Sequence, residues 1–126
     1  MILGIGIDVV DIERFSRSVD RWGDRFISRI LTSNEIDYCH KKAFPNQSMA
    51  VRFAAKEAVF KCLSEAFQQK MRWHDIEVFT ERTGRPQIHF LGDYEILHRD
   101  HRVMVSLSHM GDTAIAVVII EKMEGR

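Results

Sequence analysis

Long apolar runs are missing from this sequence. No stretch approaches the ~20 consecutive apolar residues that a helix needs to cross a bilayer. No signal peptide precedes the first strand-like residues either. We therefore expect a soluble, cytoplasmic protein without a membrane partner.

Cysteine is scarce, and neither sign of charge is in excess. Cys39 and Cys62 are the only two cysteines, and they lack the CxxC spacing of a zinc site, so we expect buried thiols in a reducing compartment. The 18 basic residues balance the 18 acidic ones, which leaves no overall attraction to nucleic acid. A partner attracted by charge must therefore bind a local patch.

The order of strand and helix patterns is typical of an α+β domain. With 126 residues, 45% of them hydrophobic, the chain has the size and apolar content of one domain, residues 1–126. Two tight hairpin connections favour an antiparallel sheet with helices on one side. The predicted strands are 1–8, 75–80, 87–91, 103–109 and 113–121, and the predicted helices are 9–18, a short segment from the break at Gly23 to 31, 35–43, 48–67 and 92–100.

The helix predicted at 48–67 is the one around which we expect the other elements to pack. Large apolar residues and alanines fill it, no Gly or Pro interrupts it, and Ser48 or Asn46 can cap its start. Charged residues in a mostly apolar helix are costly unless they have partners. Those of this helix are Arg52, Lys56, Glu57, Lys61 and Glu65.

Asp8, Glu57 and Lys61 are candidates for phosphate chemistry. Asp8 ends the first predicted strand, where it is either an N-cap or a carboxylate that faces a metal or a phosphate. Glu57 and Lys61 are four residues apart, which also suits a simple ion pair on the helix surface. Two carboxylates suit Mg²⁺, which accepts a substrate phosphate as a further ligand, and a lysine can balance the charge of that phosphate. Spacing alone leaves these alternatives open.

Two patterns predict close approach and partner binding. Gly4 and Gly6 lie on one face of the first strand, where another backbone or a ligand can come close. Arginines recur at spacings of three and four, so a continuous helix would align them, although a break at Gly23 would divide the row. The row is either a solvated surface or a stripe for an acidic partner helix. Its members are Arg14, Arg17, Arg21 and Arg25.

Four segments together resemble a known family. They are G-I-G-I-D-V-V-D-I-E-R-F, R-F-A-A-K-E-A-V-F-K, D-I-E-V with the following T-G-R-P turn, and V-S-L-S-H. In this order they resemble the holo-[acyl-carrier-protein] synthases, the small bacterial 4′-phosphopantetheinyl transferases, along nearly the whole chain. The resemblance implies the fold of that superfamily, an antiparallel sheet packed against a long central helix, and a trimer whose active sites are shared between neighbours.

The resemblance also implies a reaction and its residues. The enzyme would transfer 4′-phosphopantetheine from coenzyme A to a serine of apo-acyl carrier protein, with Mg²⁺, and release adenosine 3′,5′-bisphosphate for fatty acid biosynthesis. Asp8 and Glu57 match the metal-binding carboxylates, Lys61 matches the lysine beside the diphosphate, and the base is either a metal-ordered water or Glu57. The positions that match the coenzyme A cleft are Arg52, Lys61, Pro86 and His109, and those that match the helix binding the acidic carrier protein are Arg14, Arg21 and Arg25. His109 also suits an ordinary strand-edge residue.

One segment departs from the family pattern. Members usually carry a glycine-rich G-T-G turn after the central helix, where this chain has Ser64-Glu65-Ala66. The substitution motivates an alternative function, a non-catalytic relative that binds carrier protein or a nucleotide. The intact set of two carboxylates and a lysine argues against that alternative. The loop before the central helix leaves open whether Lys41 or Lys42 faces the cleft.

Overall fold

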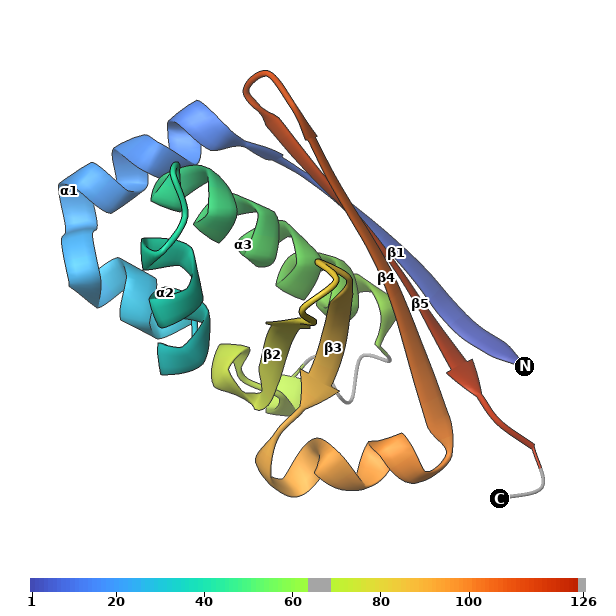
Figure 1. Cartoon of the computed structure of the whole chain (residues 1–126). Coiled ribbons are helices and arrows are strands. Elements are labelled where there is room, and N and C mark those ends of the chain that lie inside the picture. Colours follow the sequence, from blue (N-terminus) through green and yellow to red (C-terminus); the bar gives the residue numbers. More distant parts are fainter. Residues whose placement is uncertain (64–68, 125–126) are drawn as a thin grey trace.

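A three-stranded antiparallel sheet forms one side of the molecule in the computed structural model, which describes residues 1–63 and 69–124 (Figure 1). Its strands, in spatial order, are β1 (Ile2–Asp11), β5 (Thr113–Lys122) and β4 (His101–Met110). A separate antiparallel pair consists of β2 (Ile76–Thr80) and β3 (Pro86–Phe90). The predicted α+β class and both hairpins are therefore confirmed, but the strands form two sheets.

Helices cover one face of the three-stranded sheet (Figure 1). They are α1 (Ile12–Ile30), α2 (Ser33–His40), α3 (Pro45–Cys62) and the 3-10 helices η1 (Trp73–Asp75) and η2 (Gly92–Arg99). Thr32 caps α2 through a capping box with Glu35. Gly23 has a left-handed backbone (φ 60°) and interrupts α1, as predicted. Among the described residues, no helix is long and apolar enough to cross a membrane.

The central helix α3 begins earlier than its cap signals indicated. It starts at Pro45, and its N-cap residue Phe44 makes no side-chain cap hydrogen bond. Ser48 and Asn46 therefore lie inside the first turn, because proline favours the first helical position, where its fixed φ fits and its missing N–H is not needed. The helix ends at Cys62, and residues 64–67 of the predicted helix lie outside the described residues.

The first strand is longer than predicted, and this changes the position of Asp8. Its pairing with β5 continues to Asp11 opposite Thr113, so Asp8 lies within β1, opposite Ala116. Asp11 is the N-cap of α1 and accepts a hydrogen bond from the Arg14 backbone N–H at 3.1 Å. The capping alternative for Asp8 and the predicted helix start at residue 9 are therefore wrong.

Gly4 and Gly6 bring α3 directly against β1. A Cβ at Gly4 would lie 2.5 Å from the Cys62 carbonyl oxygen. A Cβ at Gly6 would overlap the Ala58 carbonyl oxygen and lie 2.9 Å from Cys62 Sγ. The predicted close approach is thus made by the backbone of α3, and it places the Asp8 side chain, on the same face of β1, beside that helix.

We expect Gly6→Ala to destabilise the fold by about 1–3 kcal/mol, because the added methyl group must push α3 away from β1. Urea unfolding at neutral pH measures the change in the free energy of unfolding. Thr83→Ala, in the exposed turn after β2, is the matched control and should change it little. Equal stability of Gly6→Ala and wild type would contradict the tight α3–β1 contact.

The other face of the three-stranded sheet carries exposed apolar side chains. On β1 these are Ile5, Ile7 and Val9, each between 57% and 64% exposed. Figure 1 shows no helix over this face. Contiguous apolar surface of this kind marks a site of association.

Candidate active site

Asp8 and Lys61 meet across the contact between β1 and α3. Lys61 Nζ donates to Asp8 Oδ1 at 2.8 Å and to the Ile7 carbonyl oxygen at 3.1 Å. The lysine side chain is half exposed, whereas Asp8 is 13% exposed. Lys61 therefore forms its ion pair with the strand, and the simple helical pair between Glu57 and Lys61 does not describe the site.

Glu57 belongs to the same electrostatic group. Burial raises the pKa of its carboxyl group, and the nearby Asp8 carboxylate raises it further, while Lys61 lowers it. A carboxylate that makes a neighbouring carboxylate harder to ionise creates a place for a cation. The structure thus brings together the three predicted catalytic residues, although Asp8 and Glu57 lie far apart in the sequence.

The donor set fits Mg²⁺ completed by a substrate. In the parts of the chain that are described, no group of three or more His, Cys, Asp or Glu side chains could hold a metal ion. Mg²⁺ needs no such group, since one or two carboxylates, waters and phosphate oxygens complete its octahedral shell. Asp8 and Glu57 provide that number of carboxylates, in a position where their mutual repulsion favours a cation.

Lys61 stays protonated at neutral pH. Its hydrogen bond to Asp8 raises the pKa of its ammonium group, burial lowers it slightly, and the charges of Asp8 and Glu57 raise it further. A protonated lysine with half of its side chain in solvent can contact an incoming phosphate while it is held by Asp8.

Arg52 points away from this group. Its guanidinium donates to Ser48 Oγ at 3.1 Å and to Thr80 Oγ1 at 2.8 Å, and it lies 4.0 Å from the centre of the Tyr38 ring. The residue is only 5% exposed, and its buried Nε atom has no hydrogen-bond partner among residues 1–63 and 69–124. Within this chain Arg52 is therefore part of a separate cationic cluster beside β2.

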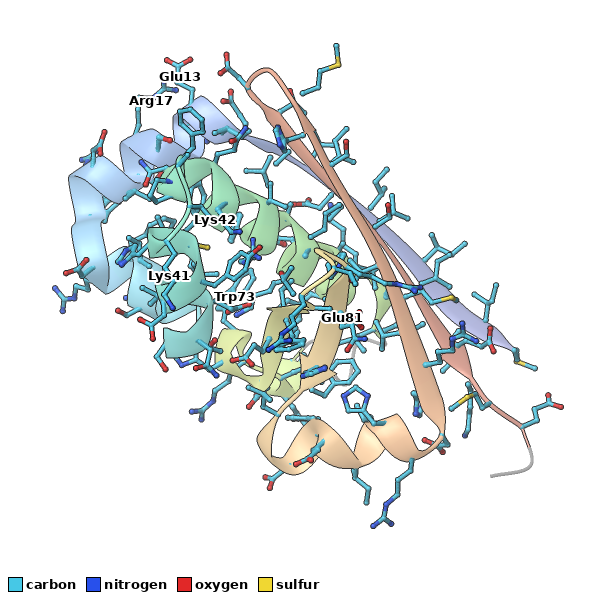
Figure 2. The ribbon with its side chains drawn as sticks, viewed as in Figure 1. Glu13, Arg17, Lys41, Lys42, Trp73 and Glu81 are labelled. Atoms are coloured by element: carbon cyan, nitrogen blue, oxygen red, sulfur yellow. The ribbon has the colours of Figure 1, made fainter. Side chains whose placement is uncertain are left out.

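Lys42 joins the Arg52 cluster. Its Nζ lies 4.6 Å from the centre of the same Tyr38 ring, so both cations contact this ring. Figure 2 labels Lys41 and Lys42 where the chain leaves α2. Lys42 is accordingly the lysine of this loop with a described contact to the cluster.

Pro86 and His109 lie in two further places. Pro86 begins β3 and lines a cleft of about 580 Å³ between β3 and β4. His109, near the end of β4, accepts a hydrogen bond at Nδ1 from Gln47 Nε2 at 3.0 Å. No described cleft contains either residue together with Glu57, so one chain does not gather the predicted coenzyme residues into one site.

The arginines of α1 do not form one continuous row. Arg14 and Arg21 precede the break at Gly23, and Arg25 follows it. Arg17 is engaged by Glu13, with 3.0 Å between NH1 and Oε1, and Figure 2 shows this pair on the outer side of α1. The predicted carrier-binding residues are therefore divided between two helical segments.

The sequence did not reveal a buried ion pair between Glu35 and Lys56, the residue that precedes Glu57 in α3. Lys56 Nζ lies 2.5 Å from Glu35 Oε1, and neither side chain is exposed. The same ammonium donates to the carbonyl oxygens of Ile30 at 2.9 Å and Trp73 at 3.1 Å. The only signal in the sequence was a lysine in an apolar helix, which indicates a partner but does not identify it.

Comparisons with known proteins agree with this arrangement. The family model of the 4′-phosphopantetheinyl transferase superfamily matches residues 4–118. The chain is 42% identical to the holo-[acyl-carrier-protein] synthase of Geobacter sulfurreducens over 125 residues, 97% of this chain and 99% of that protein. It is 43% identical to the synthase of Koribacter versatilis over 124 residues, 96% of this chain and 99% of that protein.

Solved structures of synthases have the same fold. The holo-[acyl-carrier-protein] synthase from Neisseria meningitidis matches with a TM-score of 0.82 and 32% identity, over 97% of this chain and all of that one. The synthase from Bacillus anthracis, solved in complex with CoA (3′,5′-ADP), matches with a TM-score of 0.80 and 33% identity, over 97% of this chain and 98% of that one. Sequence, fold and the grouping of Asp8, Glu57 and Lys61 lead to one conclusion: the chain belongs to the 4′-phosphopantetheinyl transferase superfamily, in the family of holo-[acyl-carrier-protein] synthases.

Proposed function

We propose that the protein transfers the 4′-phosphopantetheine group of coenzyme A to a serine of apo-acyl carrier protein and releases adenosine 3′,5′-bisphosphate. The observation that carries this proposal is the contact of Lys61 with Asp8 beside Glu57. In the reaction, the serine oxygen bonds to the β-phosphorus of coenzyme A, and the bond from that phosphorus to the bridging oxygen of the diphosphate breaks. The serine proton goes to the base, and the bridging oxygen leaves with the bisphosphate.

Asp8 and Glu57 would hold Mg²⁺ in this reaction. When bound, the ion neutralises charge on the diphosphate and on the phosphorus under attack. The two residues support this role through their chemistry, since both are partly buried carboxylates and the charge of Asp8 raises the pKa of Glu57. Removal of Mg²⁺ with a chelator is expected to stop the reaction.

Lys61 would contact the diphosphate from the strand side. Its raised pKa keeps the ammonium charged, so it can balance negative charge on the departing bisphosphate and give it a proton. Asp8 orients the lysine through the 2.8 Å hydrogen bond. The serine proton has two acceptors in this scheme, a metal-ordered water or Glu57.

The coenzyme site would be shared between subunits of a trimer. Arg52, Pro86 and His109 are the residues assigned to coenzyme A, and they lie apart from Glu57 within one chain. The cleft would be complete where one subunit places these three residues beside Asp8, Glu57 and Lys61 of its neighbour. The Nε of buried Arg52, which has no partner in the described part of the chain, and the nearby ammonium of Lys42 support an anionic ligand such as a coenzyme phosphate.

The outer face of the three-stranded sheet is the surface on which we expect the trimer to form. Ile5→Lys, at a side chain that is 64% exposed, is expected to shift the protein from trimer toward monomer without unfolding it, because it places a charge in an apolar contact. Sedimentation equilibrium measures the mass. Ile96→Lys, on η2 and 57% exposed, is the matched control and should leave the mass unchanged. If Ile5→Lys remains a trimer, the interface lies on another surface.

Arg14, Arg21 and Arg25 would bind the acidic carrier protein from α1. The exposed side of this helix offers guanidinium groups on both sides of Gly23. Arg17 is already paired with Glu13 and is the weaker candidate. The protein would act as a single domain of residues 1–126 in the cytoplasm, a location supported by its two buried free thiols.

The mass of apo-acyl carrier protein after incubation with this protein, coenzyme A and Mg²⁺ tests the proposal. We expect a gain of one phosphopantetheine group that is lost when EDTA is present. No gain, with carrier-protein binding retained, would favour the alternative of a non-catalytic binding relative. The segment that motivated the alternative, Ser64-Glu65-Ala66, lies outside the described residues.

A further inference from the structure

A cleft of about 680 Å³ opens beside Glu57, and the roles proposed above leave most of it unused. Helix α3 contributes Glu57 and Phe60 to its lining. Arg72 and the η1 residues Trp73 and His74 line another side, and Arg29 of α1 lines a third. We call this space the α1–η1 cleft. One end of it reaches a carboxylate of the candidate active site.

The rim of the α1–η1 cleft is cationic. Arg29 and Arg72 are both exposed, and no ion pair is described for either in residues 1–63 and 69–124. Asp75 is the acidic residue of the lining besides Glu57, and its Oδ2 atom accepts a hydrogen bond from the Arg72 backbone N–H at 2.8 Å. Two guanidinium groups therefore face the cleft with their charge available to a partner.

The walls of the cleft are tied to each other. His74 Nε2 donates to the Ser28 carbonyl oxygen at 2.6 Å, which joins η1 to the last turns of α1. Lys56 joins the same two segments through the carbonyl oxygens of Ile30 and Trp73. The Trp73 ring packs edge-on against Phe60, with 5.1 Å between centroids. The segments that carry Arg29 and Arg72 are thus held together before a partner arrives, which lowers the entropy cost of binding.

The charge of the rim decides between the two substrates that must reach Glu57. The proposed function places the diphosphate of coenzyme A at Lys61 and its further phosphate at the Arg52 cluster. The pantetheine arm that remains is uncharged, so it gains little from two guanidinium groups. An acidic protein surface gains from both, through charge-assisted and bidentate hydrogen bonds. Arg25 and Arg29 are also four residues apart in the second segment of α1, so Arg29 continues the proposed carrier-binding surface by one turn toward the cleft.

We propose that the α1–η1 cleft is a second docking surface for the carrier protein, in which Arg29 and Arg72 bind carboxylates of that acidic partner. This inference rests on the proposed function. It extends the carrier contact from the outer side of α1 to the edge of the active site, so that docking would place the serine next to Glu57.

The double variant Arg29→Glu/Arg72→Glu tests this surface. Calorimetry measures its affinity for an apo-acyl carrier protein whose modified serine is replaced by alanine, so the readout does not require turnover. We expect binding to weaken by roughly tenfold or more at low salt, and by less at high salt, because exposed charges are screened. The KM for coenzyme A should stay within about twofold of wild type.

Arg99→Glu is the matched control, since this arginine is exposed on η2 and does not line the cleft. It changes the net charge in the same direction and should bind carrier protein nearly as well as wild type. Circular dichroism and thermal unfolding establish that the double variant is folded.

Three results would overturn the inference. A raised KM for coenzyme A with unchanged carrier affinity would assign the cleft to the coenzyme. Unchanged values for both substrates would leave the cleft without a role in docking. An equal loss in Arg99→Glu would show a general charge effect. If wild-type protein neither binds nor modifies carrier protein, the proposed function itself fails, and this outcome is distinct from the three above.

Discussion

Glu57→Gln is expected to lower turnover by at least about 10²-fold while the protein stays folded. The amide keeps the size of the side chain and one oxygen, but it removes the negative charge that balances a divalent cation. The mass assay with carrier protein, at a series of Mg²⁺ concentrations, measures the loss. Turnover equal to wild type would show that the metal assignment of Glu57 is wrong.

The stability of the same variant provides a readout that is independent of activity. Because burial and Asp8 raise the pKa of Glu57 above its ordinary value of 4.5, the folded protein disfavours its ionised form. Wild type therefore loses unfolding free energy as the pH rises from that value through the raised pKa, whereas Glu57→Gln does not titrate. We expect the variant to be as stable as wild type at acidic pH and more stable at neutral pH.

Metal binding adds a second check on Glu57. We expect Mg²⁺ to bind the folded site and to raise the melting temperature of wild type in a concentration-dependent way. Glu57→Gln should show little of this shift. If Mg²⁺ raises the melting temperature of the variant as much as that of wild type, the ion binds at another site.

Lys56→Met is expected to cost about 3–5 kcal/mol of unfolding free energy, because it leaves the Glu35 carboxylate buried without its cation. Neither partner is exposed to solvent. Burial lowers the pKa of Lys56, and the Glu35 carboxylate opposes that shift by stabilising the charged form. The loss also removes the hydrogen bonds that Lys56 donates to Ile30 and Trp73. Urea unfolding monitored by circular dichroism measures it.

Two variants separate the charge effect from simple loss of packing. Lys56→Met/Glu35→Gln removes both charges, and the amide oxygen can still accept one of the backbone hydrogen bonds from Thr32 and Val78 that Glu35 now accepts. It should therefore recover a large part of the lost stability. Lys61→Met, in the same helix but half exposed, should cost less than about 1 kcal/mol. A double variant as unstable as Lys56→Met would contradict the role of the ion pair.

Local patterns were sufficient to predict the elements. The strand predicted at 113–121 is confirmed as β5, and every second residue of it is buried, namely Ala114, Ala116, Val118 and Ile120. Gly4 and Gly6 indicated a close approach, and the backbone of α3 makes it. These features depend on side chains a few residues apart, so the sequence contains the information directly.

Features that depend on distant contacts were predicted less well. The end of β1 was placed at Asp8 because the turn chemistry there resembles a cap, but pairing with β5 extends the strand to Asp11. The partner of Lys61 was ambiguous, since a residue four positions away competes with one on another element. Glu35 was not identified as the partner of Lys56, because nothing in a helical pattern specifies which distant carboxylate meets a buried ammonium.

The candidate site, too, was predicted only in part. The resemblance of motifs identified Asp8, Glu57 and Lys61, and the structure brings these three together. The structure leaves Arg52, Pro86 and His109 in separate places within one chain. A single sequence has no pattern that indicates contacts between subunits. Arg72 was not singled out, and Arg29 was noted only as one of the recurring arginines, because the cleft they line exists only where α1 and η1 meet.

The pairing of β1 with β5 has a consequence for biosynthesis. The Met1 amino group donates to the Lys122 carbonyl oxygen at 2.9 Å, across 121 positions of the chain. Asp8 lies in the strand that this pairing holds. A ribosome releases the residues of β5 long after those of β1, and domains form their long-range contacts only when both partners have emerged. The nascent protein would therefore hold Asp8 beside Glu57, and acquire any activity that depends on this pair, only after β5 has left the ribosome.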